Sequence, residues 1–310
     1  MILLTGANGQ LGRCLTELLP QDQVKLTDVF VDKKSSRIVD ILDITDFDAV
    51  KTYVRDNNIN CIVNCAAYNA VDKAEDDVEL ATKINVEGPK NLALSEVNTV
   101  IHVSTDYVFD GTAYKPLTPI DKTNPISVYG KTKLAGEQQL LVNAKGNAIV
   151  IRTAWLYSIY GNNFVKTIQK LGKERTELNV VADQVGTPTL ANDLASAIVT
   201  ILNKLQENKS QVPKSKQVDN IQVNSQSTPV FIKEVYHFSN EGVCSWYDFA
   251  VAIMEGTNLS CKVNPIPTSA YPTRAIRPLY SVLDKTKIKE QFGIKIPHWQ
   301  ESLKKCLSQF

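Results

Sequence analysis

The sequence predicts an α/β protein built on a doubly wound parallel sheet, with a smaller C-terminal substrate-binding lobe. Short apolar runs alternate with segments of helical periodicity up to about residue 155, as is typical of parallel βαβ units. Three closely spaced glycines follow the first apolar run. Beyond residue 156 the alternation loosens. We therefore expect a Rossmann-type dinucleotide-binding domain at 1–155, and at 156–310 mainly a substrate lobe from which some segments return to the sheet.

The elements of the first region follow from the spacing of its apolar residues. Short apolar runs predict strands at 2–4, 24–26, 61–66, 100–104 and 148–156. Apolar residues that recur every three or four positions predict helices at 10–19, 47–56, 78–97 and 128–141. In the first of these helices the leucines share one face, which we expect to pack on the sheet.

The second region is less regular. Its periodicity predicts helices at 164–171 and 193–205 and a strand at 178–181. Residues 204–228 are rich in Lys, Gln, Asn and Ser and almost free of large apolar side chains. We expect a polar insertion loop there, with a docking loop as the alternative.

Composition excludes several classes of function. Lys and Arg total 34 against 33 Asp and Glu, whereas a nucleic-acid-binding protein requires a basic surplus. No apolar run reaches the roughly 18–20 residues of a membrane span, and no signal peptide is readable. The six cysteines form no C-x-x-C pair and only three histidines occur, so we expect no metal cluster and a reducing, cytoplasmic setting.

The glycines form a G-x-x-G-x-x-G turn between the first strand and the first helix. Gly6 permits the tight turn, Gly9 lets a pyrophosphate approach the backbone, and Gly12 lets helix and strand pack closely. The helix N-terminus then offers N–H donors to the phosphates. We assign the turn, with its intervening residues, to a dinucleotide cofactor (Asn8, Gln10 and Leu11). A purely structural turn is the alternative.

Asp28 ends the second predicted strand, 16 residues after Gly12. An acid near this distance meets the adenine ribose hydroxyls in dinucleotide-binding folds. A carboxylate there favours NADH, because it repels the 2′-phosphate of NADPH. From position alone, an acid in a surface turn is an equal alternative.

Tyr129 and Lys133 lie four residues apart in a predicted helix and so share one face. An ammonium group beside a phenol favours the phenolate and lowers the tyrosine pKa. The pair is therefore suited to proton transfer during hydride transfer. The alternative is a solvated helix face.

Thr105 stands at the end of the predicted strand 100–104, at the sheet edge where open α/β folds bind ligands. Its hydroxyl can hydrogen-bond a carbonyl oxygen and polarise it. A simple strand-end cap is the alternative. Together with the glycine turn and the Tyr–Lys pair, however, Thr105 indicates a Ser/Thr–Tyr–Lys oxidoreductase site.

Longer strings link these motifs to a family. Residues 63–75 (VNCAAYNAVDKAE), 104–111 (STDYVFDG) and 129–137 (YGKTKLAGE) resemble the dTDP-4-dehydrorhamnose reductases of the extended short-chain dehydrogenase/reductase family. RTAWLY at 152–157, DQVGTPT at 183–189 and PTSAYPTRAIRP at 267–278 continue the likeness. The resemblance covers nearly the whole chain outside 204–228.

The resemblance implies the last step of dTDP-L-rhamnose synthesis: reduction of the 4-keto group of dTDP-4-dehydro-β-L-rhamnose with NADPH or NADH. Tyr129 would donate the proton, Lys133 would tune Tyr129 and hold the cofactor ribose, and Thr105 would orient the carbonyl. Further cofactor contacts are implied at Asp43, Ile44, Ala66, Ala67, Tyr68 and Lys73. The substrate, a dTDP-sugar, would meet Val71, Asp106, Tyr107, Trp155, Asn162, Asn163, Gln184, Arg274 and Arg277.

The sequence departs from the family at one implied site. Some members form a dimer through magnesium held by three glutamates, and the matching positions here are Cys14, Asn192 and Gln300. None is a carboxylate, the ligand that a hard divalent cation prefers. We therefore expect no such magnesium site and a monomer, with a dimer as the alternative.

Two other functions stay open at this point. One is a different nucleotide-4-ketosugar reductase or an epimerase, because pocket shape decides the sugar. The other is a non-catalytic binding protein like the regulatory subunit of methionine adenosyltransferase, which carries a similar YGKTKL string. The intact STDYVF, AVDKAE and SAYPTRAIRP strings favour the reductase.

Overall fold

A computed structural model describes residues 1–32, 36–210 and 231–310 of the chain. Its centre is a seven-stranded sheet in the order β11-β6-β5-β4-β1-β2-β3, and every neighbouring pair is parallel. In chain order its strands are β1 (Ile2–Thr5), β2 (Val24–Asp28), β3 (Asp40–Ile41), β4 (Cys61–Asn64), β5 (Thr99–Thr105), β6 (Asn147–Thr153) and β11 (Lys233–His237). The doubly wound sheet is thus confirmed.

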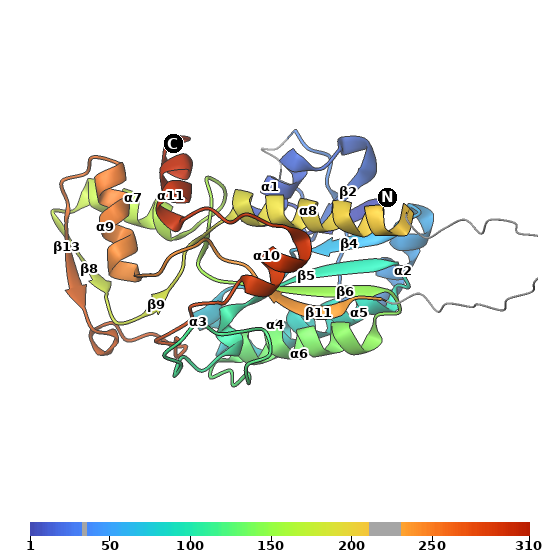
Figure 1. Cartoon of the computed structure of the whole chain (residues 1–310), viewed down its shortest axis with the longest axis horizontal. Helices are drawn as coiled ribbons and strands as arrows, with labels where there is room; N and C mark the ends of the chain where they lie inside the picture. The colour runs from blue at the N-terminus through green and yellow to red at the C-terminus, as the bar shows by residue number, and fades with distance from the viewer. Residues whose placement is uncertain (33–35, 211–230) are drawn as a thin grey trace, which may run out of the picture.

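Helices cover both faces of this sheet (Figure 1). One face carries α1 (Gln10–Leu18), α8 (Ala191–Ser210) and α10 (Thr286–Phe292). The other carries α2 (Phe47–Asp56), α5 (Gly88–Leu94) and α6 (Val128–Asn143). Because both faces are covered, the central strands are buried on both sides and read as continuous apolar runs.

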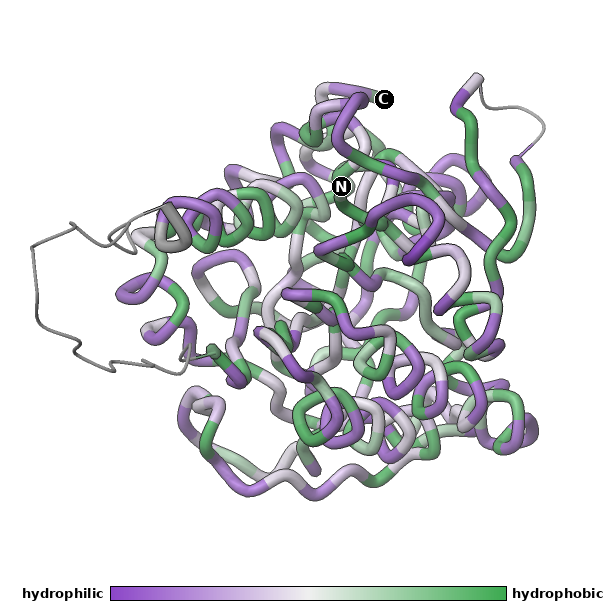
Figure 2. Tube along the Cα trace, turned by 90° about the vertical axis from the view of Figure 1, so that its right-hand side faces the viewer, coloured by the Kyte–Doolittle hydropathy of each residue, from purple (hydrophilic) through white to green (hydrophobic). Residues whose placement is uncertain are grey.

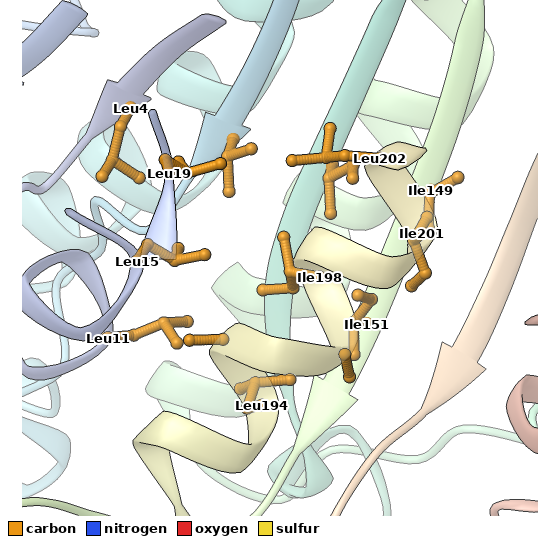
Figure 3. Packing of buried hydrophobic residues seen from close by; sticks show 14 of the residues in the cluster. Leu4, Leu11, Leu15, Leu19, Ile149, Ile151, Leu194, Ile198, Ile201 and Leu202 are labelled. Atoms are coloured by element: carbon orange, nitrogen blue, oxygen red, sulfur yellow. The ribbon is translucent and has the colours of Figure 1, made fainter. Parts of the chain in front are cut away.

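Alternate residues of each strand serve the two faces. Leu4, Ile149 and Ile151 pack against leucines and isoleucines of α1 and α8 (Figure 3), whereas Leu3 and Val150 pack on the opposite side. Burying each such side chain contributes about 1.5–3 kcal/mol. The predicted leucine face of the first helix therefore lies on the sheet.

The smaller lobe is built from short elements around its own apolar cluster, which includes Tyr157, Phe249 and Trp299. Its strands pair in twos: β7 (Leu156–Tyr157) with β10 (Thr189–Leu190), β9 (Val185–Gly186) with β12 (Cys244–Ser245), and β8 (Glu177–Val181) with β13 (Lys262–Ile266). Its helices are α7 (Phe164–Glu174), α9 (Trp246–Gly256) and α11 (Trp299–Leu307). Helices alternate between purple and green in Figure 2, as amphipathic helices do.

One expected helix is interrupted. Residues 78–97 form α4 (Val78–Thr82), a π-helical turn η2 (Lys83–Glu87) and α5, which ends at Leu94. Pro89 stands at the start of α5, and its missing N–H removes a helical donor at the junction. The short helix α3 (Val71–Ala74) precedes this segment.

The polar loop expected at 204–228 is wrong for its first residues, because α8 runs on to Ser210. Leu205 is buried against the sheet-facing core while Lys204 and Glu207 stay exposed, so polar composition here marks the outer face of a helix. Residues 211–228 lie outside the described residues. After them β11 joins the edge of the sheet, beside β6. The domain division at residue 155 stays a prediction.

Within the three described ranges, none of the helices is long and apolar enough to span a membrane.

Candidate active site

The glycine turn between β1 and α1 is closed by contacts that leave no room for side chains. Gly6 has φ +68°, and a Cβ built there would lie 2.7 Å from the backbone nitrogen of Ala66. A Cβ on Gly12 would lie 2.3 Å from the carbonyl oxygen of Gly6. Gly9 is the N-cap of α1, so no side chain covers the first N–H groups of the helix. This cradle fits a dinucleotide pyrophosphate.

A cavity of about 360 Å³ opens beside this turn. Eight of the predicted cofactor residues line it: Gly6, Asn8, Gly9, Asp28, Asp43, Ile44, Ala66 and Ala67. Thr45, which continues the Asp43–Ile44 segment, also lines the cavity. Sequence reasoning missed other lining residues that follow strands or lie on the interrupted helix, namely Val29, Phe30, Leu42, Leu80, Lys83 and Ile84. Their apolar surfaces suit a flat adenine ring.

Asp28 forms part of the cavity wall and is held from both sides. Its Oδ2 accepts from the backbone nitrogen of Asn8 at 2.9 Å, and its Oδ1 accepts from that of Val29 at 2.8 Å. Arg37 donates to the side-chain oxygen of Asn8 at 3.2 Å, and Arg13 donates to its backbone oxygen at 3.2 Å. Two guanidinium groups therefore contact Asn8, the partner of Asp28, and Arg13 is also paired with Asp32.

Four predicted cofactor residues have other side-chain partners. Gln10 accepts hydrogen bonds from Ser158 and Asn163, and Leu11 is buried in the core, which leaves only its backbone toward a ligand. Tyr68 donates its hydroxyl to Asp77 at 3.0 Å and its backbone nitrogen to Asn85. Lys73 is exposed, with Nζ 3.7 Å from Asp77.

Thr105 and Tyr129 meet at the carboxyl edge of the sheet. Thr105 is the last residue of β5, and Tyr129 is the second residue of α6, which Ser127 caps through the backbone nitrogen of Gly130. Burial raises the pKa of Tyr129 to about 12, the hydrogen bond with Thr105 lowers it, and the charge of Asp106 raises it. The ring of Tyr107 stands edge-on, 5.6 Å from that of Tyr129.

The side chain of Lys133 has its hydrogen-bond partners on β5, and its role in lowering the pKa of Tyr129 stays a prediction. Its Nζ donates to the carbonyl oxygen of Val103 at 2.7 Å and lies 3.3 Å from Nε2 of His102. The lysine is buried, and burial lowers its pKa to about 8. The amino group of Lys133, which the sequence predicted beside the Tyr129 phenol, is turned toward β5.

Asp106 is a buried acid next to this hydroxyl pair. Its Oδ1 accepts from Thr105 at 3.1 Å, whereas Oδ2 is buried and makes no hydrogen bond of ordinary geometry. Burial raises its pKa to about 6, against the lowering effect of the Ser281 and Thr105 hydroxyls. The orphaned oxygen is a group that a sugar hydroxyl can satisfy.

Trp155 enters the site in a left-handed backbone conformation, with φ +48°. Its ring stacks on Trp246 of the lobe, with centroids 3.6 Å apart and planes 12° apart. The unusual backbone conformation and the stacking on Trp246 together restrict the Trp155 ring. The two rings therefore form a fixed apolar wall at the boundary between sheet and lobe.

The remaining predicted substrate residues are dispersed. Gln184 is buried and donates to Thr268 at 3.1 Å. Asn163 caps α7 and Asn162 is exposed beside it, while Val71 begins α3. The two arginines pair with acids near α3: Arg274 with Asp76 at 2.6 Å, and Arg277 with Asp72.

The structure also reveals functional partners that sequence reasoning missed. Asp72 receives both Nη atoms of Arg277 and the backbone nitrogen of Ala275, so it ties the loop of residues 267–278 to α3. Asp72 and Arg277 are 205 positions apart, and no local pattern signals such a pair. Among the described residues, no group of three or more His, Cys, Asp or Glu could hold a metal ion.

Comparisons with known proteins agree with this geometry. A family model described as the RmlD substrate binding domain matches residues 1–310. The dTDP-4-dehydrorhamnose reductase of Aggregatibacter actinomycetemcomitans is 40% identical, over 98% of this chain and 97% of that protein. The Escherichia coli protein of the same name is 37% identical, over 99% and 97%.

Solved structures give the same result. A dTDP-4-dehydrorhamnose reductase from Clostridium acetobutylicum superposes with a TM-score of 0.83 at 39% identity, covering 99% of this chain and 98% of that one. The Bacillus anthracis enzyme, solved in complex with NADP, gives 0.82 at 35% identity, covering 100% and 99%.

Proposed function

The chain belongs to the RmlD substrate-binding-domain family, and on that basis we propose that it is a dTDP-4-dehydrorhamnose reductase. It reduces the 4-keto group of dTDP-4-dehydro-β-L-rhamnose to the alcohol of dTDP-L-rhamnose, the last step of dTDP-rhamnose synthesis. The observation that carries this proposal is the hydrogen-bonded pair of Tyr129 and the buried Thr105 at the carboxyl edge of the sheet, the edge at which the glycine turn also follows β1.

The glycine turn and the cavity would hold the cofactor, NADPH or NADH. The N–H groups at the start of α1 would bind the pyrophosphate, and the apolar wall would accept the adenine. Asp28 is placed for ribose hydroxyls, while Arg37 and Arg13 offer positive charge to a 2′-phosphate. This combination supports use of both cofactors.

The chain itself would supply one proton and the groups that orient the substrate carbonyl. A bound NAD(P)H supplies the hydride that reduces the sugar carbon. Thr105 donates a hydrogen bond to the carbonyl oxygen, and Tyr129 transfers its hydroxyl proton to the alkoxide as it forms. Lys133 would then hold the cofactor ribose and stabilise the phenolate left on Tyr129.

The sugar nucleotide would lie between the sheet edge and the lobe. The orphaned oxygen of Asp106 would accept from a sugar hydroxyl, and the stacked ring of Trp155 would flank the sugar. Gln184, Val71, Tyr107 and the asparagines 162 and 163 are proposed as further contacts. Arg277 and Arg274 would face the diphosphate end, because the loop that carries them is fastened there.

We further propose that residues 1–155 bind the cofactor and 156–310 mainly the sugar nucleotide. A monomer is proposed because two of the positions matching the magnesium glutamates, Cys14 and Asn192, contact each other at 3.5 Å and burial raises the pKa of that thiol to about 12. A cytoplasmic location is proposed because all six cysteines are free thiols.

A coupled assay tests the function. dTDP-glucose is supplied with a 4,6-dehydratase and a 3,5-epimerase, and absorbance at 340 nm is followed with NADPH and with NADH. We expect oxidation that requires the epimerase and yields dTDP-L-rhamnose. Oxidation without the epimerase would identify a different 4-ketosugar reductase, and no oxidation by folded protein would favour a non-catalytic binding protein.

A further inference from the structure

A string of three buried side chains, Asn64, His102 and Lys133, runs behind the glycine turn. Its first member, Asn64, is the last residue of β4 and is fully buried. Its Oδ1 accepts from the backbone nitrogen of Ala66 at 3.1 Å and from the hydroxyl of Thr5 at 2.6 Å. Because a backbone N–H can only donate, the amide oxygen must face Ala66 and the amide nitrogen must face the other way.

That amide nitrogen fixes the proton on His102. Nδ2 of Asn64 lies 2.9 Å from Nδ1 of His102, and Nδ2 can only donate, so Nδ1 must accept. The imidazole is fully buried, and this burial lowers its pKa well below the usual value. A neutral imidazole that accepts at Nδ1 carries its hydrogen on Nε2.

The hydrogen on Nε2 points at Lys133. Nε2 lies 3.3 Å from Nζ, and Nζ also donates to the carbonyl oxygen of Val103 at 2.7 Å. An ammonium group has no lone pair, so it would place two donors against each other at a buried site. A neutral amine has a lone pair for Nε2–H and retains a hydrogen for Val103.

We infer that Asn64 and His102 hold Lys133 as a neutral amine turned away from Tyr129, and that binding of the nicotinamide cofactor moves this amine off His102 with uptake of one proton. The inference rests on the proposed function, because it requires a nicotinamide dinucleotide at the glycine turn. His102 and Asn64 are thus positioning residues that act through Lys133.

The other groups around Nζ are compatible with a neutral amine on Lys133. Burial lowers the pKa of Lys133 to about 8, and the charge of Glu137 acts against that shift. Glu137 is itself paired, since both of its oxygens accept from Arg152 and one also accepts from Ser104. The thiol pKa of Cys65 is raised to about 12, so Cys65 is neutral. Tyr129, on the same helix, is also uncharged at neutral pH.

The change of state is a simple protonation. Once Nζ leaves Nε2–H, its lone pair takes a proton from solvent and forms an N–H bond. The negative charge of the pyrophosphate favours the ammonium form, and burial beside ribose hydroxyls satisfies its donors. Above pH 8 the lysine is therefore charged only when a cofactor is present, which limits phenolate formation to the loaded site in that pH range.

The first experiment titrates Lys133 in the protein without added cofactor. The protein is labelled with ¹³Cε-lysine, and Lys133→Met identifies the resonance of Lys133. We expect that resonance to titrate at pH 8 or below. A midpoint near the usual lysine value of about 10.4 would overturn the inference.

Two variants separate the effect of the Asn64–His102 hydrogen bonds on the Lys133 midpoint from the effect of burial. In Asn64→Asp a carboxylate oxygen faces Nδ1, so the imidazole proton moves to Nδ1 and Nε2 becomes an acceptor for the ammonium. We expect the Lys133 midpoint to rise by about 1–3 pH units. His102→Gln is the matched control, because its amide can accept from Asn64 and donate to Lys133, and its midpoint should stay low. Equal midpoints in wild type and Asn64→Asp would contradict the inference.

The second experiment measures protons taken up on cofactor binding. NADPH is titrated calorimetrically in two buffers of different ionisation enthalpy, from pH 6 to pH 9.5. We expect uptake to rise toward one proton above pH 8 and to disappear in Asn64→Asp. Saturable binding without uptake at pH 9 would overturn the inference. Absence of binding would instead contradict the proposed function, and the lysine titration would still decide the inference.

Discussion

The two ends of the site are made in different ways. At the cofactor end, backbone atoms form the site: in the turn of Gly6, Gly9 and Gly12, a Cβ at Gly6 or Gly12 would collide with neighbouring backbone atoms. At the sugar end, side chains from distant segments meet, as in the stack of Trp155 on Trp246 and the pair of Arg277 with Asp72. The first end is compact in sequence and the second is dispersed.

This difference indicates which positions of the site tolerate substitution. The backbone of the glycine turn can adopt only one conformation within its close contacts, so one added methyl group can disrupt it. A pocket wall made of several side chains can lose one of them and keep its shape. The residues proposed for the chemistry, Thr105 and Tyr129, lie on the border between the two. Mutations should therefore have their largest effect at the border, a large effect at the glycines and a small one at the arginines.

Removing the proton donor should have the largest effect. Tyr129→Phe deletes one hydroxyl at the border and should lower turnover by about 10²–10⁴-fold while cofactor affinity is kept. Steady-state rates and cofactor titrations measure the two quantities. Turnover within a factor of a few of wild type would show that another group supplies the proton.

A methyl group at the cofactor end should come next. Gly12→Ala places Cβ 2.3 Å from a carbonyl oxygen and should cost about 3 kcal/mol in the free energy of unfolding, with loss of cofactor binding. Gly293→Ala is the matched control, because Gly293 has φ +64° but open space around it, and it should cost only about 1–2 kcal/mol. Denaturant unfolding measures both, and equal losses would refute the role of the backbone contact.

Asp106 should give a pH-dependent effect. Its pKa of about 6 in the folded protein lies above the unfolded value of about 3.9, so the folded state binds more protons between pH 4 and 6. Its contribution to stability therefore falls as pH rises through that window, by up to about 3 kcal/mol. Asp106→Asn should remove this slope. The difference in unfolding free energy between wild type and variant, measured at pH 4 and pH 7, tests the sign.

The arginine pair at the sugar end should give the smallest effect on stability. Arg277→Met removes a partly exposed pair, so the unfolding free energy should fall by about 0.5–1 kcal/mol, with a several-fold rise in KM for the sugar nucleotide. Arg274→Met, at a more exposed pair, serves as the control and should change stability by less than about 0.5 kcal/mol. An unchanged KM in Arg277→Met would remove Arg277 from the substrate site.

Local patterns predicted the sheet well and its edges poorly. α2 has the bounds that periodicity gave, and β5 differs from its expected range by one residue at each end. β11 was missed, because it pairs only with β6, and the two strands are separated by more than 75 residues. β3 is two residues long, which is too short for any periodicity to show.

The candidate site shows the same difference between residues that local patterns predict and residues whose roles depend on distant segments. Most of the cofactor residues lie within a few positions of the glycine turn or of a strand end, so spacing and resemblance were enough to name them. The state of Lys133 could not be read from its helix, because His102 and Val103 on another strand decide it. Trp246 was missed since nothing near it in sequence indicates a partner at Trp155.

The tryptophans give the molecule a built-in optical reporter. Of the three in the chain, Trp246 and Trp299 belong to the lobe and Trp155 is stacked on the first of them. Tryptophan fluorescence, excited selectively over the tyrosines, therefore reports on the lobe and on its boundary with the sheet. Fluorescence and far-ultraviolet circular dichroism recorded in the same denaturant series would thus reveal whether the two halves melt as one cooperative unit or in sequence.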